Sequence, residues 1–173
     1  MKKLLILLSI FMISTSCETP ESSQVIGFSI NNDGERSDIT IEADITDIWL
    51  EYIDAHNDRD YVKIAEMNSE DIKVWGPAGQ YIEGKEAHVE FVKEWVQATN
   101  VKWTPQWFIN NSGENPDSSD KPLGVNNYVT SGHQMTFTID GVETIFYQVH
   151  DAVIRDGKII NFNVYEQQRA VSE

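Results

Sequence analysis

Two histidines and a glutamate are the side chains of this sequence best suited to moving a proton. His133, His150 and Glu166 lie in the second half of the chain, where apolar and polar residues alternate. A histidine titrates near neutral pH, so it can donate or accept a proton, and a nearby carboxylate could complete a His–carboxylate pair. Buried histidines also occur as hydrogen-bonded polar groups without a catalytic role. The residue types alone leave both interpretations open.

The alternation predicts which rows of side chains in these strands are buried, because successive residues of a strand point to opposite faces. The buried row predicted for 127–139 consists of Val129, Ser131, His133, Met135, Phe137 and Ile139. The inward row predicted for the last strand consists of Ile160, Phe162, Val164 and, at its end, Glu166. In 143–154 both rows carry apolar residues, so alternation does not decide whether Gln148 and His150 face inward.

The elements that would position these residues follow in the order helix, helix, strand pair, helix and antiparallel meander. The first helix is predicted over 41–56, where Ile48, Trp49, Tyr52 and His56 share one face. The other helices are predicted over 60–67 and 85–98, the third with an inner stripe of Ala87, Phe91, Trp95 and Ala98 and with His88 facing solvent. Strands are predicted over 71–75, 81–82, 101–109, 125–139, 143–154 and 158–167.

Two Asp-Gly pairs support the meander, since Asp-Gly favours tight hairpin turns. They are residues 140–141 and 156–157. Helices that precede a curved antiparallel sheet must cover one of its faces. The sequence therefore predicts an α+β domain.

The first residues have the pattern of a bacterial lipoprotein signal. Lys2 and Lys3 precede a ten-residue apolar run over 4–13, which is too short to span a bilayer as a helix. Small residues 14–16 then precede Cys17, the only cysteine of the chain. Ordinary secretion that leaves Cys17 as an unmodified thiol is the alternative.

The predicted organisation is a signal peptide over 1–16, a lipidated acidic tether over 17–38 and one domain over 39–170. Lipid on Cys17 would anchor the chain in the cell envelope, and Glu18 after the cysteine resembles lipoproteins of the outer membrane or cell surface. A partner cysteine is absent from the sequence, so the domain must be stable without an intrachain disulfide.

Composition limits the functions that this chain can have. Its 173 residues suit one domain, and the net charge of −15 argues against nucleic-acid binding, which requires a basic surface. His56, His133, His150 and Glu166 are metal-ligand types, but no pair has a short ligand spacing, so we predict no metal site. No phosphate-binding loop or nucleophilic triad is apparent in the sequence, and we predict no cofactor.

The order of elements and three motifs resemble the nuclear transport factor 2-like superfamily, which includes SnoaL-like and ketosteroid isomerase-like domains. The motifs are YIDAHNDRDY over 52–61, IKVWGPAGQYIEGKEAH over 72–88 and IRDGKIINFNVYEQ over 154–167. The resemblance covers about residues 40–170. It implies a cone-shaped fold, in which a strongly bent, mostly antiparallel sheet wraps around the first helix and leaves an apolar pocket open at one end.

Similarity to ketosteroid isomerase suggests positions for the site. It places His150 where that enzyme has a protonated carboxylic acid and Tyr52 where it has an oxyanion-binding tyrosine. It places His133 at a pocket-lining position, and the dehydratases of the superfamily suggest a His–carboxylate pair with Glu166. Gly76 stands where that enzyme has its general base, so steroid isomerisation is not expected.

These observations lead to three hypotheses, because one fold can host many functions. The first is a pocket that binds a small apolar or amphipathic molecule. Its predicted ligand contacts are Trp75, Trp49, Gln148, Met135, Phe137 and Phe162, with Trp95, Trp103 and Trp107 as further aromatic residues that line or fill the pocket. The second is an isomerase, dehydratase or cyclase that uses Tyr52, His150 and His133 or Glu166. The third is a homodimerisation or scaffold module whose outer sheet face carries Tyr128, Tyr147 and Tyr165.

Overall fold

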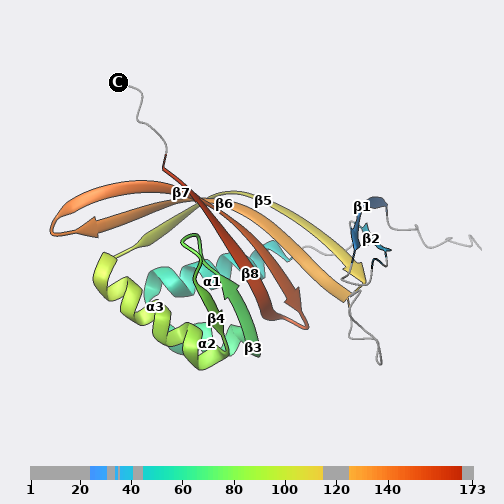
Figure 1. The fold of residues 1–173 in the computed structure, drawn as a ribbon, viewed down its shortest axis with the longest axis horizontal. Helices are drawn as coiled ribbons and strands as arrows, with labels where there is room; N and C mark the ends of the chain where they lie inside the picture. The colour runs from blue at the N-terminus through green and yellow to red at the C-terminus, as the bar shows by residue number, and fades with distance from the viewer. Residues whose placement is uncertain (1–23, 31–33, 35, 41–44, 115–124, 169–173) are drawn as a thin grey trace, which may run out of the picture.

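A strongly curved sheet with helices on one of its faces makes up the domain, as the computed structural model in Figure 1 shows. The structure describes residues 24–30, 34, 36–40, 45–114 and 125–168. The eight strands are ordered β1-β2-β5-β6-β7-β8-β3-β4. The predicted signal peptide and Cys17 lie outside the described residues.

The three helices are α1 (Thr46–Asp58), α2 (Tyr61–Met67) and α3 (Lys85–Thr99). All three lie on the same side of the long strands (Figure 1). The predicted α+β architecture is therefore confirmed. Within the described ranges, none of the helices combines the length and the apolar character needed to cross a membrane.

The sheet is antiparallel except where β3 (Asn68–Trp75) pairs in parallel with β8 (Lys158–Gln167). β4 (Tyr81–Glu83) lies at one edge beside β3, and the long strands β6 (Val125–Ile139) and β7 (Val142–Arg155) form the centre. Both predicted Asp-Gly hairpins are present: Asp140 and Asp156 have positive φ angles of 51° and 50°, and a glycine follows each.

Residues 25–30 and 36–40, which fall largely within the predicted tether over 17–38, form two strands. β1 (Val25–Ile30) and β2 (Arg36–Thr40) form a hairpin at the far end of the long strands (Figure 1). Two residues of β2, Ile39 and Thr40, pair with Gly113 and Ser112 of β5 (Lys102–Glu114). β5 extends beyond the predicted 101–109 because its continuation pairs with both β2 and β6.

Paired hydrogen bonds attach the C-terminal end of α1 to β5. The Asn57 side chain donates to the Trp103 carbonyl and accepts from the Trp103 amide, each at 2.8 Å. Arg59 adopts a left-handed conformation with φ of 63° and ends α1, and its guanidinium donates to the Val101 carbonyl at 2.7 Å. These contacts hold the last turn of α1, which carries His56, at a defined place over the sheet.

The residues of α3 that were predicted to face inward are not the ones that are buried. Ala87 and Ala98 are exposed, whereas the buried residues are His88, Val89, Val92 and Val96. Phe91 and Trp95 are half-buried. The helix packs against α2 on one side and β3 on the other, so its covered surface is wider than a single row and includes the polar His88.

The rows predicted for the sheet agree with the structure at the centre and differ at its margins. Val129, Ser131, His133 and Met135 are buried on β6, and on β7 the row containing Gln148 and His150 faces inward. Ile139 is 49% exposed because it lies at the tip of the β6–β7 hairpin. Ile159 rather than Ile160 is buried on β8, since a bulge opposite Val153 and Ile154 shifts the register there.

Candidate ligand-binding site

A cavity of about 290 Å³ lies between the helices and the inner face of the sheet. Its walls come from α1, α3 and strands β3, β5, β6, β7 and β8. The exposed turn between β3 and β4, residues 76–80, and the exposed Glu166 at the end of β8 form its mouth. The cavity approaches the usual size of a small-molecule site.

Aromatic side chains dominate the wall of this cavity. Trp49 and Tyr52 of α1 are almost fully buried at 0% and 1% exposure. The other aromatic wall residues include Phe91, Trp95, Trp103 and Phe162. Trp95 contacts Trp103 edge to face with ring centres 5.4 Å apart, and Trp49 meets Phe162 in the same way at 5.7 Å. Such a surface suits a flat apolar molecule.

One polar group of the wall is a chain of hydrogen bonds from Tyr52 to His88. The Tyr52 hydroxyl donates to Asn68 Oδ1 at 2.6 Å, and Asn68 Nδ2 lies 3.0 Å from His88 Nδ1. An amide nitrogen only donates, so His88 Nδ1 accepts and the neutral ring carries its proton on Nε2. Burial raises the pKa of Tyr52 well above its usual value, which keeps the hydroxyl protonated.

His56 lies beside these hydrogen-bonded residues, and its ring has the opposite tautomer to that of His88. Its Nδ1 is 2.7 Å from the backbone oxygen of Tyr52, one helical turn earlier. A carbonyl oxygen only accepts, so His56 Nδ1 carries the proton and Nε2 carries a lone pair in the neutral ring. The ring centres of His56 and His88 are 6.0 Å apart, and both residues line the cavity.

A second polar group connects β5, β7 and β8. Gln148 Oε1 accepts from Trp103 Nε1 at 3.1 Å and from His150 Nε2 at 3.0 Å. The amide of Gln148 donates to Glu166 Oε2 at 2.9 Å. Gln148 therefore connects His150 to Glu166 near the mouth, and it leaves His150 Nδ1 buried without a partner in the described structure.

His133 lies behind His150 rather than on the cavity wall. Their ring centres are 4.6 Å apart, and His133 Nε2 is 2.8 Å from Ser131 Oγ. Ser131 Oγ also accepts from Trp49 Nε1 at 2.8 Å, so its own proton is available to His133. His133 lines a shallow depression that also includes Trp107 and Tyr147.

All four histidines of the domain are held neutral at pH 7. Burial is the main cause in each case, and it lowers the pKa of His56 and His133 to about 4 and that of His88 to about 3. The pKa of His150 is well below its usual value, because burial is reinforced by the nearby His133 and His56. The histidines can thus offer hydrogen bonds but no positive charge.

Comparisons with known proteins agree with this geometry at the level of fold. No protein-family model matches the chain, and no curated protein sequence matches it either. A ketosteroid isomerase-like protein from Erwinia carotovora superposes with a TM-score of 0.56 at 16% identity, over 72% of this chain and 95% of that one. An LEH-like epoxide hydrolase from M. tuberculosis superposes with a TM-score of 0.55 at 10% identity, over 70% and 80%.

A third structure, TerC co-crystallised with polyporic acid, superposes with a TM-score of 0.55 at 18% identity, over 70% of this chain and 90% of TerC. This chain has the nuclear transport factor 2-like fold. The predicted fold is therefore confirmed, while these identities are too low to transfer a function.

In this nuclear transport factor 2-like domain, the predicted site residues divide into two sets. Those on the cavity wall are Tyr52, His150, Glu166, Trp49, Gln148, Phe137 and Phe162. The others, His133, Met135 and Trp75, do not line it. The catalytic roles suggested for Tyr52, His150, His133 and Glu166 stay predictions, and the hydroxyl of Tyr52 is already engaged with Asn68.

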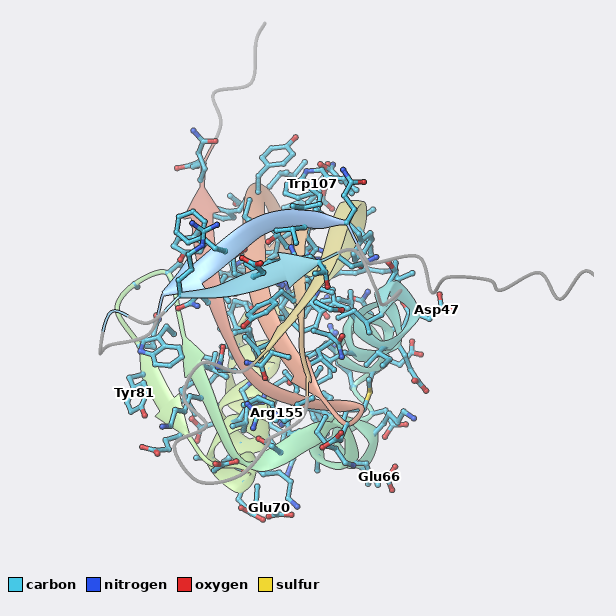
Figure 2. All side chains as sticks on the ribbon, turned by 90° about the vertical axis from the view of Figure 1, so that its right-hand side faces the viewer. Asp47, Glu66, Glu70, Tyr81, Trp107 and Arg155 are labelled. Carbon is cyan, nitrogen blue, oxygen red and sulfur yellow. The ribbon has the colours of Figure 1, made fainter. Side chains whose placement is uncertain are left out.

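The three residues outside the cavity have different reasons for their positions. Among the strands, β7 and β8 contribute most of the lining and β6 contributes only Phe137, while the β6 residues His133 and Met135 are buried outside the cavity. Trp75 is 39% exposed and packs on Tyr81, because the inward positions of β3 are Ile72 and Val74. Trp107 likewise lies on the outer face of the sheet, away from the helices (Figure 2), against Gly132.

The outer sheet face carries other exposed apolar residues. Tyr165 is 56% exposed, Ile109 58% and Ile145 41%, while Tyr128 and Tyr147 are half-buried. Homodimerisation through this face of the nuclear transport factor 2-like domain stays a prediction.

Among the residues of the wall and its support that the sequence did not place there are His56, His88 and Asn68. His88 was predicted to face solvent, but it is 2% exposed. The step from Tyr52 to His56 is one helical turn and places both on the same face, which was a usable signal. Asn68 and His88 come from separate elements, β3 and α3, and no spacing in the sequence relates them.

The part of the chain that the structure describes holds no group of three or more His, Cys, Asp or Glu side chains placed to bind a metal ion. Glu166 is the one acid among the described residues around the cavity, and Gly76, the position at which the resemblance placed the general base of ketosteroid isomerase, lies at the mouth.

Proposed function

We propose that this chain is a cell-envelope lipoprotein whose nuclear transport factor 2-like domain binds a small, neutral, largely apolar molecule. The observation that carries the proposal is the cavity itself, which is walled by aromatic side chains and reaches solvent between the β3–β4 turn and Glu166. A domain with a fully packed core would have no cavity open to solvent. An apolar cavity with a few fixed polar groups is the usual form of a ligand site.

The electrostatics of the wall support a neutral ligand. His56, His88 and His150 are uncharged at pH 7, so an anion would find no cation among them. Glu166 at the mouth and the net charge of −15 also oppose anions. A cation that entered the cavity would leave Glu166 behind at the mouth and would meet mainly apolar side chains, so cations are disfavoured as well. The ligand must therefore gain most of its binding energy from apolar contact.

Filling the cavity is expected to remove the bound molecule. Val164 of β8 is half-buried and lines the cavity, so the indole of Val164→Trp would occupy the space that a ligand needs. Native mass spectrometry of the protein purified from its own host is expected to show a small-molecule adduct that Val164→Trp lacks.

Val149→Trp is the matched control, because Val149 lines the shallow depression beside Trp107 and Tyr147 rather than the cavity. It is expected to retain the adduct. An adduct of the same mass on Val164→Trp would contradict binding in the cavity.

The anchoring part of the proposal rests on residues 1–17 and is tested separately. Cys17→Ser removes the thiol that would carry the lipid, so the protein is expected to lose incorporation of labelled palmitate and to move from the membrane to the soluble fraction. Single acyl chains bind membranes only marginally, and stable anchoring requires more than one. Ser16→Ala preserves a small residue before the cysteine and is expected to remain in the membrane fraction. Persistence of Cys17→Ser in that fraction would overturn lipid anchoring through this residue.

A further inference from the structure

Two histidines on the deep wall present opposite hydrogen-bonding groups to the cavity. His56 comes from the last turn of α1 and His88 from the first turn of α3. The Nδ1 atom of each is engaged by the protein, in His56 as a donor to the Tyr52 carbonyl and in His88 as an acceptor from Asn68. The tautomers are thereby fixed by backbone and side-chain contacts rather than by the ligand.

The Nε2 atoms of these two rings remain for a ligand. Neither has a hydrogen-bond partner in the described residues, and neither is sealed from solvent in the way that Nδ1 of His133 and His150 are. His56 Nε2 is an acceptor, and His88 Nε2 carries a proton and is a donor. When two nitrogens are hydrogen-bonded to the same oxygen, they lie about 4 to 5 Å from each other. The ring centres of His56 and His88 are 6.0 Å apart, so their Nε2 atoms can reach this separation.

We propose that His56 and His88 form a subsite for a single neutral hydroxyl group of the ligand, either an alcohol or a phenol. The hydroxyl donates its proton to His56 Nε2, and its oxygen accepts from His88 Nε2–H. The inference rests on the proposed function, since it names the chemical class of the molecule that the cavity binds.

A hydroxyl fits this pair better than other polar groups do. A carbonyl or ether oxygen accepts from His88 but leaves the lone pair of His56 unpaired in a buried place, which is unfavourable. A carboxylate accepts only, and it would enter a wall that has no positive charge. The aromatic side chains around the pair, Trp49, Tyr52 and Trp103, would then contact the apolar body of the ligand.

Three naphthalene probes separate this subsite from apolar binding in general. The purified full chain is titrated with naphthalene, 2-methoxynaphthalene and 2-naphthol, and saturable quenching of tryptophan fluorescence reports binding at the tryptophan-lined wall. We expect 2-naphthol to bind roughly 10-fold more tightly than its methyl ether, because the ether cannot donate to His56.

Variants of the two histidines are expected to act differently on this preference. His56→Phe removes the acceptor and is expected to reduce the preference for 2-naphthol over its ether to about 1-fold. His88→Phe removes a donor that both probes use, so both affinities fall and the preference persists. His133→Phe is the matched control, since His133 is a buried histidine outside the cavity, and it is expected to leave both affinities unchanged.

The proposal fails if the wild-type protein binds 2-naphthol and its methyl ether equally well, an outcome that leaves apolar binding in the cavity intact. Absence of saturable binding for all three probes would instead overturn the proposed function as well. If a variant does not fold, histidine nitrogen NMR of the wild-type protein still decides. It is expected to show His56 protonated on Nδ1 and His88 on Nε2, and 2-naphthol is expected to shift both Nε2 resonances; identical tautomers would contradict the subsite.

Discussion

Acidification from about pH 7 to about pH 5 is expected to unfold this domain. His56, His88, His133 and His150 are all buried and neutral in the folded protein, with pKa values lowered to about 4, about 3, about 4 and well below normal, respectively. In the unfolded chain the same rings have the ordinary value of 6.5. The unfolded state therefore binds protons at a pH where the folded state does not.

The direction of the effect follows from proton linkage. Above the unfolded pKa both states are neutral and these histidines do not affect stability. As the pH falls through that value the unfolded state gains protons and is favoured, until the folded rings also become protonated near their own lower pKa values. Each histidine costs about 1.4 kcal/mol one pH unit below the unfolded pKa, and four cost about 5 to 6 kcal/mol, comparable with the whole stability of many domains.

Urea unfolding over this pH range measures the effect. The free energy of unfolding is expected to fall by about 5 to 6 kcal/mol at about pH 5.5, with uptake of about four protons. His133→Phe removes one of these groups without touching the cavity, so its proton uptake is expected to be about three. A stability that is flat between about pH 7 and about pH 5 would show that the buried histidines find partners in acid.

Trp49→Ala is expected to cost the most stability of any single substitution in the cavity wall. The indole is fully buried, and it contacts Tyr52, Phe162 and His150 with ring centres between 5.3 and 5.9 Å away. Truncating a buried tryptophan to alanine typically costs about 3 to 5 kcal/mol. The cavity also lies against this side chain, so the new space would merge with it.

Trp49→Phe separates the hydrogen bond from the packing. It retains most of the ring contacts but loses the donation from Nε1 to Ser131 Oγ at 2.8 Å. We expect a loss of about 1 to 2 kcal/mol in the free energy of unfolding, measured in urea at neutral pH. Ser131→Ala combined with Trp49→Phe is expected to cost more than Trp49→Phe alone, because the double variant also removes the hydrogen bond between Ser131 Oγ and His133 Nε2. A cost below about 1 kcal/mol for Trp49→Ala would mean that helix α1 collapses into the cavity.

From α1 onward, the sequence by itself determined the order of the elements and most of their faces. Alternation in 127–139 identified Val129, Ser131, His133 and Met135 as buried, and the Asp-Gly pairs located both hairpins. Three motifs in the correct order indicated the fold. These features are local: a period of two or of about 3.6 residues states which side of a strand or helix is covered.

Only the tertiary structure decided which covered side chains meet the cavity. His133 and His150 both face inward, yet His150 lines the cavity and His133 lies behind it. His88 joined the site because Asn68, twenty residues earlier in the chain, holds its ring. A repeating pattern indicates to which side of its own helix or strand a side chain points, but not which residues of another element it faces. A cavity forms where two elements that are distant in sequence leave a space between them. The pairing of His56 with His88 thus depends on how α1 and α3 dock on the sheet, which no single segment encodes.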